Sequence, residues 1–318
     1  MLRSRAAALG ACGATAAAGL FFYRQQQSAR VPPGSALQPN TSLACPLLSV
    51  EPLSADTSRY RFGLPTPQHV LGLPAASHLL AHDSAMVCRA YTPVTLDKFD
   101  KGHFDLIVKR YPNGLFSEAF AGLKLGDTMS FRGPVTTLRY EPNVVKTLGM
   151  VCGGTGITPM YQIIRTVLSD PSDTTVLRLV YANKSPSDIL LWTELEALAA
   201  AHPGRLAVRY VVERASGEGA PAGQLAAGLG SSGVHEAGAR GRVAVGRVVG
   251  ADDLVGFLPG PSEARAAVLV CGPAGMLRHL CGEDPSQRGS VGPRQVGGLL
   301  GALGYGKQVV EFSDRNLV

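Results

Sequence analysis

The stretch VCGGTGITPM, residues 151–160, decides how the rest of this chain is arranged. An apolar run, Thr147 to Cys152, precedes its glycines, and an amphipathic run, Tyr161 to Leu168, follows them. The first run predicts a buried strand and the second a helix, so the glycines lie at a strand-to-helix turn. Residues without a Cβ atom let the N–H groups of a helix N-terminus approach an anionic or flat ligand. The turn is therefore either a nucleotide site or a plain glycine-rich connection.

Downstream of this turn, apolar strands alternate with helical runs. The strands expected are residues 147–152, 176–182, 206–212, 266–272 and 308–312, and the helices are residues 158–168, 190–201 and 296–303. Such alternation predicts a parallel sheet with helices on both faces, and ligands bind at the carboxyl ends of its strands. Both the glycine turn and Cys271-Gly272-Pro273 fall at that edge. We therefore expect a Rossmann-like nucleotide domain over residues 144–318.

Upstream of the turn, from Leu43 to about Tyr140, the sequence consists of short alternating segments broken by Pro and Gly. The strands expected are residues 60–65, 86–91, 104–111 and 128–133, with a short helix near residues 117–122. Several short strands at regular spacing predict a small antiparallel barrel, over residues 43–143. The fold class expected is thus a β-barrel followed by an α/β domain.

The bulk composition excludes two classes of function. Of the net charge of +6, four positive charges, Arg3, Arg5, Arg24 and Arg30, precede the first acidic residue, Glu51. A phosphate-backbone reader needs a dense basic stripe, which the body of the chain lacks, so no nucleic-acid partner is expected. The six cysteines form no CxxC pair and no Cys/His metal spacing, so no metal site is expected.

The N-terminal segment, residues 1–24, has a composition of its own. The uncharged run from Ala6 to Tyr23 has 18 residues, rich in Ala and Gly, with Arg on both flanks. As a helix it would be about 27 Å long, just enough to span a bilayer. This pattern predicts a membrane anchor of the mitochondrial outer-membrane type, with a cleaved mitochondrial presequence and an unordered tail as alternatives. Residues 25–42 are expected to be a linker.

Two barrel segments carry residue types suited to a flavin. In RAYTPV, residues 89–94, Arg89 can hold a diphosphate, the Tyr91 ring can lie against a flat ligand, and Thr92 can hydrogen-bond a ring nitrogen. In KRYPNGLFS, residues 109–117, the turn at Gly114 and the Ser117 hydroxyl open a helix that can clamp a diphosphate. An ordinary edge strand and a capped hairpin turn are the alternatives for these two segments.

Eight segments together resemble one family, the NADH-cytochrome b5 reductases of the ferredoxin-NADP reductase superfamily. They are LPTPQHVLGLPAASH (64–78), RAYTPV (89–94), DLIVKRY (105–111), GLFS (114–117), LKLGDTMSFRGP (123–134), LGMVCGGTGITPM (148–160), YANKSPSDILL (181–191) and VLVCGPAGM (268–276). The resemblance covers residues 43–312 with one interruption. Its specificity comes from the shared order and spacing of the eight segments rather than from one motif.

The resemblance implies FAD in the barrel and NADH in the second domain. Thr92, Lys109 and Cys271 are then the expected catalytic residues, with Thr92 near flavin N5 and Cys271 beside the nicotinamide. The residues implied to bind the two cofactors are Arg89, Ala90, Tyr91, Thr92, Val108, Lys109, Tyr111, Gly114, Leu115, Phe116, Ser117, Gly154, Thr155, Thr158, Glu213, Cys271, Gly272 and Pro273. Without the resemblance, Cys271 would be read as a small buried thiol.

The chain departs from the family pattern at two places. The family's Gly-Lys-x-Ser becomes Gly114-Leu115-Phe116-Ser117, so one phosphate-facing Lys is absent. Residues 215–241, rich in Gly and Ala, replace a shorter turn, and we expect a flexible surface insertion. Just before it, Glu213 can accept a hydrogen bond from a ribose 2′-OH, which favours NADH over NADPH, although Arg214 favours the reverse and a solvated Glu213 is the alternative.

The function implied is a hydride transfer from NADH to FAD, followed by single-electron transfer to cytochrome b5 or a similar haem protein. Exposed basic residues are candidates for meeting an acidic cytochrome, with a solvated face as the alternative: Lys98, Lys101, Lys124, Arg132 and Arg139. Other acceptors on the same fold, or a membrane-tethered flavin-binding scaffold without turnover, are the rival functions. We expect a monomer on the mitochondrial outer membrane facing the cytosol, with the endoplasmic reticulum or the mitochondrial interior as alternatives.

Overall fold

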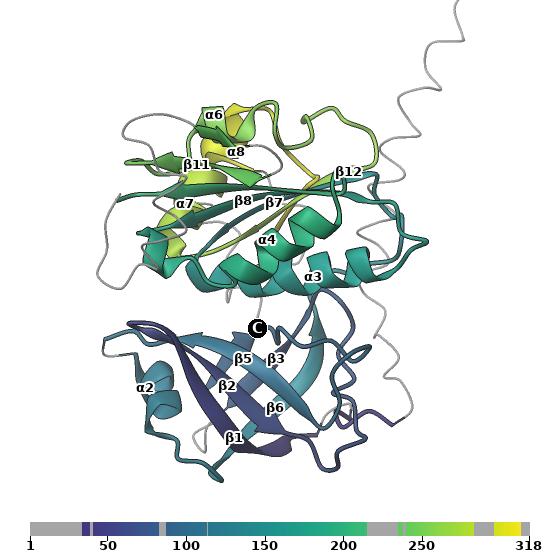
Figure 1. The fold of residues 1–318 in the computed structure, drawn as a ribbon, viewed down its shortest axis with the longest axis vertical. Coiled ribbons are helices and arrows are strands. Elements are labelled where there is room, and N and C mark those ends of the chain that lie inside the picture. The colour runs from purple at the N-terminus through teal and green to yellow at the C-terminus, as the bar shows by residue number, and fades with distance from the viewer. Residues whose placement is uncertain are drawn as a thin grey trace, which may run out of the picture.

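The structure is a computed structural model that describes residues 34–38, 41–82, 87–112, 114–214, 235–237, 240–282 and 296–312. These residues form a smaller antiparallel domain and a larger α/β domain, which lie one against the other (Figure 1). The predicted anchor, residues 1–24, lies outside the described residues. Among the residues that are described, no helix combines the length and apolar character needed to cross a bilayer.

The antiparallel domain is a six-stranded sheet with the order β4-β3-β6-β1-β2-β5. Its strands are β1 (Leu43–Ser54), β2 (Thr57–Gly63), β3 (Ser77–His82), β4 (Cys88–Tyr91), β5 (His103–Lys109) and β6 (Thr128–Thr136). This confirms the predicted small antiparallel, barrel-like sheet. The sequence pattern did not reveal β1, because Pro46 and Pro52 interrupt it. β1 pairs with β6 over Leu43–Pro46 and mainly with β2 beyond that point, and a strand paired on one side tolerates proline.

Aromatic side chains fill the core of this domain. The Phe62 ring lies 5.0 Å from Phe131 and 5.6 Å from Phe104, centroid to centroid, and all three rings are fully buried. Helix α2 (Leu115–Gly122) covers one side of this core through Phe116 and Phe120. Edge-to-face and offset arrangements of this kind are the favoured geometries of aromatic pairs.

The larger domain is a seven-stranded sheet with the order β10-β11-β9-β8-β7-β12-β13. Its strands are β7 (Thr147–Gly153), β8 (Val176–Asn183), β9 (Leu206–Val212), β10 (His235–Ala237), β11 (Arg240–Val245), β12 (Ala266–Cys271) and β13 (Val309–Phe312). All neighbouring strands are parallel except β10 and β11. The predicted parallel sheet is therefore confirmed, and it has two further strands at one edge, the parallel β11 and the antiparallel β10.

The expected flexible insertion at residues 215–241 is wrong at its end. Residues 235–237 form β10, and β11 begins at Arg240, where it pairs in parallel with β9. The composition did not reveal β10 or the start of β11, because strand formation depends on pairing with neighbouring strands more than on the residue types themselves. Residues 215–234 lie outside the part of the chain that is described.

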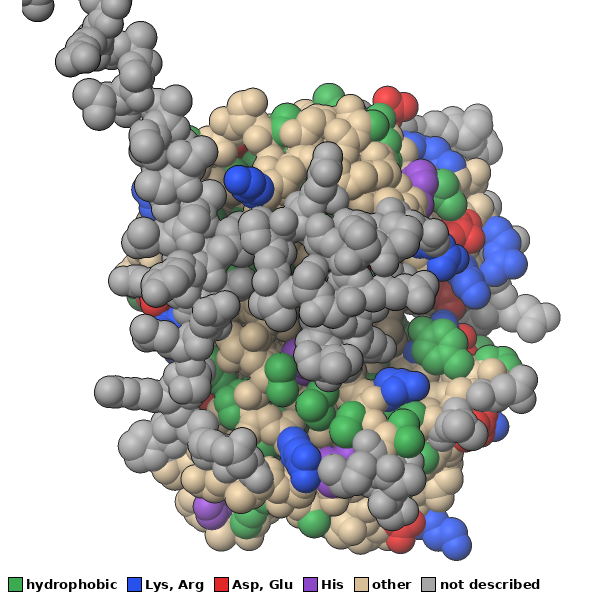
Figure 2. Space-filling model, turned by 180° about the vertical axis from the view of Figure 1, so that it is seen from behind, with side chains coloured by type: hydrophobic (Ala, Val, Ile, Leu, Met, Phe, Trp, Pro, Cys, Tyr) green, Lys and Arg blue, Asp and Glu red, His purple; other side chains and the backbone are tan. Residues whose placement is uncertain are grey.

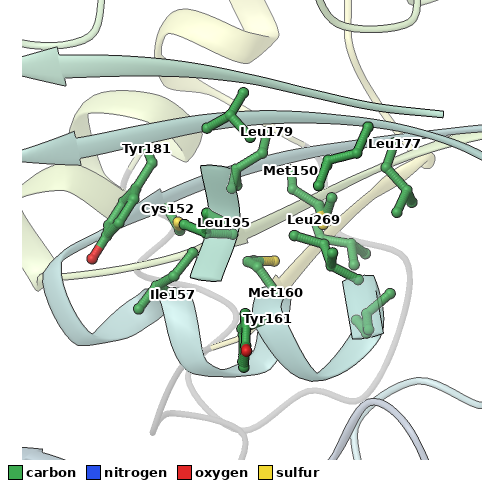
Figure 3. Packing of buried hydrophobic residues seen from close by; sticks show 14 of the residues in the cluster. Met150, Cys152, Ile157, Met160, Tyr161, Leu177, Leu179, Tyr181, Leu195 and Leu269 are labelled. Atoms are coloured by element: carbon green, nitrogen blue, oxygen red, sulfur yellow. The ribbon is translucent and has the colours of Figure 1, made fainter. Parts of the chain in front are cut away.

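Helices cover both faces of the larger sheet, as predicted. α3 (Ile157–Ser169) and α4 (Trp192–Ala201) lie on the face toward the smaller domain (Figure 1). Their apolar side chains pack with those of β7 and β8 into one core, part of which is shown in Figure 3. The opposite face packs against α6 (Ala251–Leu254), α7 (Ala274–Cys281) and α8 (Gly298–Ala302). The expected helix at residues 296–303 thus corresponds to α8, which is shorter.

The two domains share a packed and hydrogen-bonded junction. Val94 and Ile107 of the smaller domain belong to the same apolar core as helix α3. From α3, Arg165 donates a 2.8 Å hydrogen bond to the carbonyl oxygen of Val94, and the Gln162 amide donates to the carbonyl oxygens of Ser77 and Pro93 at 3.3 and 3.5 Å. The helix that follows the glycine turn therefore also fixes the strand ends of the smaller domain.

Candidate functional site

The glycine turn after β7 is a short 3-10 turn, η2 (Gly154–Gly156), that leads directly into α3. Gly154 has a φ of +54°, a backbone conformation that favours glycine. At Gly156 an added Cβ atom would overlap the carbonyl group of Cys271, and at Gly153 it would lie 2.6 Å from the Met276 sulfur. The glycines therefore allow two backbone segments from different parts of the sequence to touch.

The second of these segments is Cys271-Gly272-Pro273, where β12 ends and α7 begins. An added Cβ at Gly272 would lie 2.9 Å from the Met276 sulfur and 3.2 Å from the backbone nitrogen of Gly153. Cys271 is the last residue of β12 and is half-buried, and Pro273 is exposed. The structure thus brings the two predicted segments together at the carboxyl edge of the sheet, where α/β proteins bind ligands.

A buried tyrosine holds the glycine turn in place. The Tyr181 hydroxyl donates to the carbonyl oxygen of Gly154 at 3.0 Å and accepts from the N–H of Leu190 at 3.2 Å. Burial raises the pKa of Tyr181 well above its ordinary value, and the neighbouring Cys152 adds to this, so the side chain is a neutral donor. A neutral hydroxyl can donate to a carbonyl without carrying charge into the core.

The two threonines of the turn differ in their surroundings. Thr158 is buried, and its hydroxyl donates to the carbonyl oxygen of Thr155 at 3.1 Å. Thr155 is half-buried. The Thr158 side chain is therefore engaged with the turn itself, whereas Thr155 lies at its surface. The predicted contacts of both with the cofactors stay predictions.

In the smaller domain, β4 carries the first group of predicted flavin residues. β4 is an edge strand, paired only with β3, so one side of the Arg89–Tyr91 backbone is not used by the sheet. The Tyr91 ring packs on Phe116, with ring centroids 6.2 Å apart, and on Phe120 at 5.0 Å. Arg89 is exposed, and its guanidinium donates to the adjacent Cys88 carbonyl at 2.8 Å. An exposed guanidinium beside an open strand edge fits an anionic ligand.

The Tyr91 contacts also bring the second predicted segment to this site. α2 begins at Leu115 directly after Gly114, so RAYT and GLFS lie side by side. The Ser117 hydroxyl donates to the carbonyl oxygen of Gly114 at 2.9 Å and accepts from the N–H of Tyr111 at 3.1 Å. A Cβ at position 114 would lie 2.6 Å from this hydroxyl. The structure therefore uses Ser117 to shape the turn, and binding of a phosphate by the N–H groups at the start of α2 stays a prediction.

The third group of predicted residues lies on β5 and beyond its end. Val108 is buried in the barrel core, so its side chain points away from the sheet surface that Lys109 occupies. The Lys109 ammonium forms an ion pair with Asp56, with an N–O distance of 2.6 Å, and Tyr111 is half exposed. Partial burial alone would raise the pKa of Asp56, but the hydrogen bonds from Lys109 and Thr57 outweigh it and lower that pKa.

The predicted residues of the two domains meet at the domain junction. β5 lies beside the turn Gly154–Gly156, and this turn contacts Cys271 and Gly272. After β4, the half-buried Thr92 precedes Pro93, whose carbonyl accepts the hydrogen bond from Gln162. Residues predicted from both domains thus converge on one site.

Glu213 lies at the same carboxyl edge of the larger sheet as the glycine turn, but not next to that turn. It follows the end of β9, which is separated from β7 by β8, so it is about 10 Å from the glycine turn across the sheet. Its side chain is exposed, and its backbone N–H donates to the Asn183 carbonyl at 3.1 Å. This position fits the far end of an extended dinucleotide, and the choice between NADH and NADPH by Glu213 stays a prediction.

Sequence reasoning missed four residues that shape the site. Tyr181 bonds to the glycine turn, Asp56 pairs with Lys109, and Gln162 bonds to the Pro93 carbonyl beside Thr92. The Met276 sulfur lies against Gly153 and Gly272. Tyr181 and Met276 lie within two of the eight segments that resemble the family, at residues 181–191 and 268–276. Their place in those segments could have suggested that they lie near the site. Asp56 and Gln162 are distant in sequence from their partners, so no sequence pattern indicated that they contribute to the site.

The five basic residues predicted to meet a cytochrome are all exposed, but three have partners within the chain. Lys98 donates to the Ser169 carbonyl at the domain junction, Arg132 donates to the Ser42 hydroxyl at 3.1 Å, and Arg139 pairs with Glu141 at 3.4 Å. On the face seen in Figure 2, Lys and Arg side chains lie in separate groups, several of them beside acidic side chains. A docking role for these residues stays a prediction.

The residues present fit a flavin and a dinucleotide. Two turns whose glycines leave no room for a Cβ atom, an exposed Arg beside an open strand edge, and the first turn of α2 are the features that such ligands need. Lys109, at the end of β5, is paired with Asp56, so its charge is balanced within the chain. These features come from both domains, so the site depends on their packing.

Comparison with domain families agrees with this division. Residues 44–140 match the oxidoreductase FAD-binding domain, and residues 150–224 match the oxidoreductase NAD-binding domain. The boundary between the two matches lies in the segment that joins β6 to β7.

Curated relatives match over most of the chain. An NADH-cytochrome b5 reductase-like protein of Arabidopsis thaliana is 35% identical over 299 residues, covering 91% of this chain and 81% of that protein. NADH-cytochrome b5 reductase 2 of Xenopus tropicalis is 36% identical over 290 residues, covering 82% of this chain and 87% of that protein.

Solved structures share the fold. The cytochrome b5 reductase domain of Ulva prolifera nitrate reductase is 32% identical, with a TM-score of 0.67, and the match covers 87% of this chain and 100% of that domain. The CS-b5R domains of human Ncb5or, at 22% identity and a TM-score of 0.59, share the fold over 86% of this chain.

Proposed function

Because this chain belongs to the NADH-cytochrome b5 reductase family and is an oxidoreductase that uses FAD and NADH, we propose that it delivers electrons singly to cytochrome b5 or a similar haem protein. One observation carries the proposal. The turn Gly154–Gly156 of the NAD-binding domain lies between β5 of the FAD-binding domain and Cys271-Gly272. A nicotinamide at that turn and a flavin on β4 and β5 would share one site.

Bound FAD supplies the chemistry, because it accepts a hydride from NADH and releases electrons one at a time. The chain's own residues contribute binding and alignment, which can account for much of the rate when two rings must meet in one geometry. In this proposal Arg89 and the first turn of α2 hold the diphosphate, and the flavin lies against the Tyr91 ring, which packs on Phe116.

On the nucleotide side, the proposal puts the nicotinamide between the glycine turn and Cys271. Tyr181 fixes the Gly154 carbonyl, and the close approach of Gly156 to Cys271 fixes the second turn against the first. Lys109, at the end of β5 and paired with Asp56, would border the flavin and the incoming dinucleotide. Thr92 is the candidate donor to the flavin ring, because its loop is anchored by Gln162.

Anaerobic mixing tests the proposal directly. The FAD-bound protein is mixed with NADH, and the flavin absorbance is followed, after which oxidised cytochrome b5 is added and haem reduction is recorded. We expect the flavin band to bleach and the haem to become reduced at a rate that falls with ionic strength. A flavin band that persists with NADH would favour a flavin-binding scaffold without turnover.

A second acceptor is favoured by one of the comparisons. The similar domain of Ulva prolifera belongs to a nitrate reductase, so a different haem domain could receive the electrons here. Comparing cytochrome b5, a quinone and ferricyanide at equal NADH separates these possibilities. Bleaching of the flavin without faster reduction of cytochrome b5 than of the quinone would exclude cytochrome b5 as the acceptor.

We further propose that the chain is a monomer attached to the mitochondrial outer membrane through residues 1–24, with its body in the cytosol. The support is the uncharged run from Ala6 to Tyr23 between arginines, and the absence of acidic residues before Glu51. Carbonate extraction and protease protection of isolated mitochondria test the location. Release by carbonate, or protection from protease with the outer membrane intact, would contradict it.

A further inference from the structure

Two thiols lie next to each other where β7 pairs with β12 in the larger sheet. Cys152 of β7 and Cys271 of β12 are register partners on parallel strands. Neighbouring strands lie about 4.8 Å apart, so residues in register have Cα atoms within the range that a disulfide spans. Both side chains face the same apolar core, because Cys152 belongs to that core and Cys271 packs against it. The structure records both as thiols.

The two thiols differ in their exposure to solvent. Cys152 is fully buried, and in Figure 3 it lies near Ile157, Tyr181 and Leu195 beneath the sheet. Cys271, at the end of β12, is half-buried at the site where the two glycine turns meet. Burial raises the pKa of the Cys152 thiol well above its ordinary value, and Cys271 adds to this shift. A small oxidant can therefore reach Cys271, whereas Cys152 is shielded and protonated.

We propose that Cys271 and Cys152 form a covalent modification site, in which a hydroperoxide oxidises Cys271 and Cys152 then closes an intramolecular disulfide. In the first step the Cys271 thiolate attacks the peroxide, the O–O bond breaks, and a sulfenic acid and hydroxide form. In the second step the Cys152 sulfur displaces the sulfenic oxygen, and its proton leaves with that oxygen as water. The two thiols lose two electrons, and one peroxide is reduced.

The position of Cys271 allows the movement that this bond needs. Cys271 is the last residue of its strand, and the next residue, Gly272, carries no side chain. The bond would turn the Cys271 sulfur toward β7 and away from the predicted nicotinamide position. This consequence rests on the proposed function, and it predicts that NADH no longer reduces the flavin in the oxidised protein. Neighbouring strands constrain a disulfide strongly, so a dithiol should reduce it readily.

Peptide mapping tests the modification without reference to activity. The FAD-bound full chain is treated with hydrogen peroxide, its remaining thiols are blocked with N-ethylmaleimide, and an unreduced digest is analysed by mass spectrometry. We expect a linked pair of peptides containing Cys152 and Cys271, and a loss of NADH-dependent flavin reduction proportional to the linked fraction. Dithiothreitol should restore both. Absence of the linked pair after peroxide treatment would overturn the proposal.

Two variants test whether Cys152 is the second thiol of the disulfide. Cys152→Ala keeps a small apolar side chain in the core and removes the second thiol, and Cys45→Ala removes an equally buried thiol in the other domain. Cys45→Ala should behave as the wild type. Cys152→Ala should start with normal turnover but lose it irreversibly, because Cys271 then proceeds to the sulfinic acid. Full recovery of Cys152→Ala with dithiothreitol would contradict the role of Cys152. Formation of the linked pair in a protein that NADH never reduces would support the modification site and reject the proposed function.

Discussion

The hydroxyl group of Tyr181 donates a 3.0 Å hydrogen bond to the carbonyl oxygen of Gly154. This contact joins the centre of the seven-stranded sheet to the turn that positions the candidate nicotinamide site. Gly154 has a positive φ and no side chain, so it makes no side-chain contact that could hold the turn. The stability of the site therefore depends on a buried side chain from the neighbouring strand.

Tyr181→Phe should loosen this turn without disturbing the FAD-binding domain. The change removes the hydroxyl from the Gly154 carbonyl, which keeps the Ile157 N–H as a donor, and it takes the acceptor from the Leu190 N–H; the loss costs about 1–3 kcal/mol. We expect the free energy of unfolding to fall by that amount and the KM for NADH to rise severalfold, with FAD content unchanged. Denaturant unfolding and steady-state kinetics measure the two effects. Tyr305→Phe is the matched control, since its hydroxyl donates to Pro259 in the core on the opposite face, and an equal rise in KM there would contradict the prediction.

Gly156→Ala should separate the two turns of the site. The added Cβ would overlap the carbonyl group of Cys271, which belongs to the backbone and cannot rotate away. We expect NADH-dependent flavin reduction to fall by more than about tenfold, the effect of a displacement of roughly 1 Å at a reacting centre. Stopped-flow absorbance measures this rate. Gly260→Ala adds a methyl group where no atom lies within 4 Å, so wild-type rates are expected. A normal rate in Gly156→Ala would remove the Cys271 turn from the site.

Arg89→Ala should weaken FAD binding. A charge-assisted hydrogen bond to a phosphate is worth about 1.5–3 kcal/mol, which corresponds to a loss of roughly 10- to 100-fold in affinity. Arg89 is exposed and donates to the adjacent Cys88 carbonyl, so the apoprotein should keep its thermal stability. Flavin fluorescence during dilution gives the dissociation constant. Arg132→Ala removes another exposed arginine of the same sheet, and equal weakening of FAD binding by both variants would argue against a specific contact.

His78 should make the protein less stable in mild acid. Burial lowers the pKa of His78 from its ordinary value of 6.5 to about 4. Below pH 6.5 the unfolded chain binds a proton that the folded chain does not bind until about pH 4. The free energy of unfolding therefore falls as the pH is lowered through this window, by about 3 kcal/mol in total.

His78→Gln removes this titration, so its unfolding free energy should fall less between pH 6.5 and pH 4 than that of the wild type. Denaturant unfolding at several pH values measures the difference in slope. Parallel slopes for the wild type and His78→Gln would show that another group causes the acid sensitivity.

Much of the fold could be predicted because its signals are local. Apolar runs such as Val176–Asn183 and Leu206–Val212 are buried on both faces of a parallel sheet, so hydrophobicity alone marks them. β1, with its two prolines, and the edge strand β10 carried no comparable signal. Their strand conformation depends on partners from other parts of the chain.

In the candidate site, too, some features could be predicted from the sequence and others could not. The glycine turn, RAYT and GLFS are recognisable because each needs particular residue types at fixed short spacing. The functions of their side chains were less predictable. Ser117 and Thr158 donate to the backbone of their own turns, and Val108 packs inward, because local geometry satisfies these groups before any ligand does.

The sequence by itself determined that a strand, a glycine turn and a helix follow one another at residues 147–168, and that two domains of different strand pattern flank this point. Those features follow from hydrophobic period and from the freedom of residues without a Cβ, which act over a few neighbouring positions. Only the tertiary structure decided that Tyr181 holds Gly154, that Asp56 holds Lys109, and that Cys152 lies beside Cys271. Strand order and domain packing set these contacts, and the residues involved are separated by 27 to 119 positions in the chain.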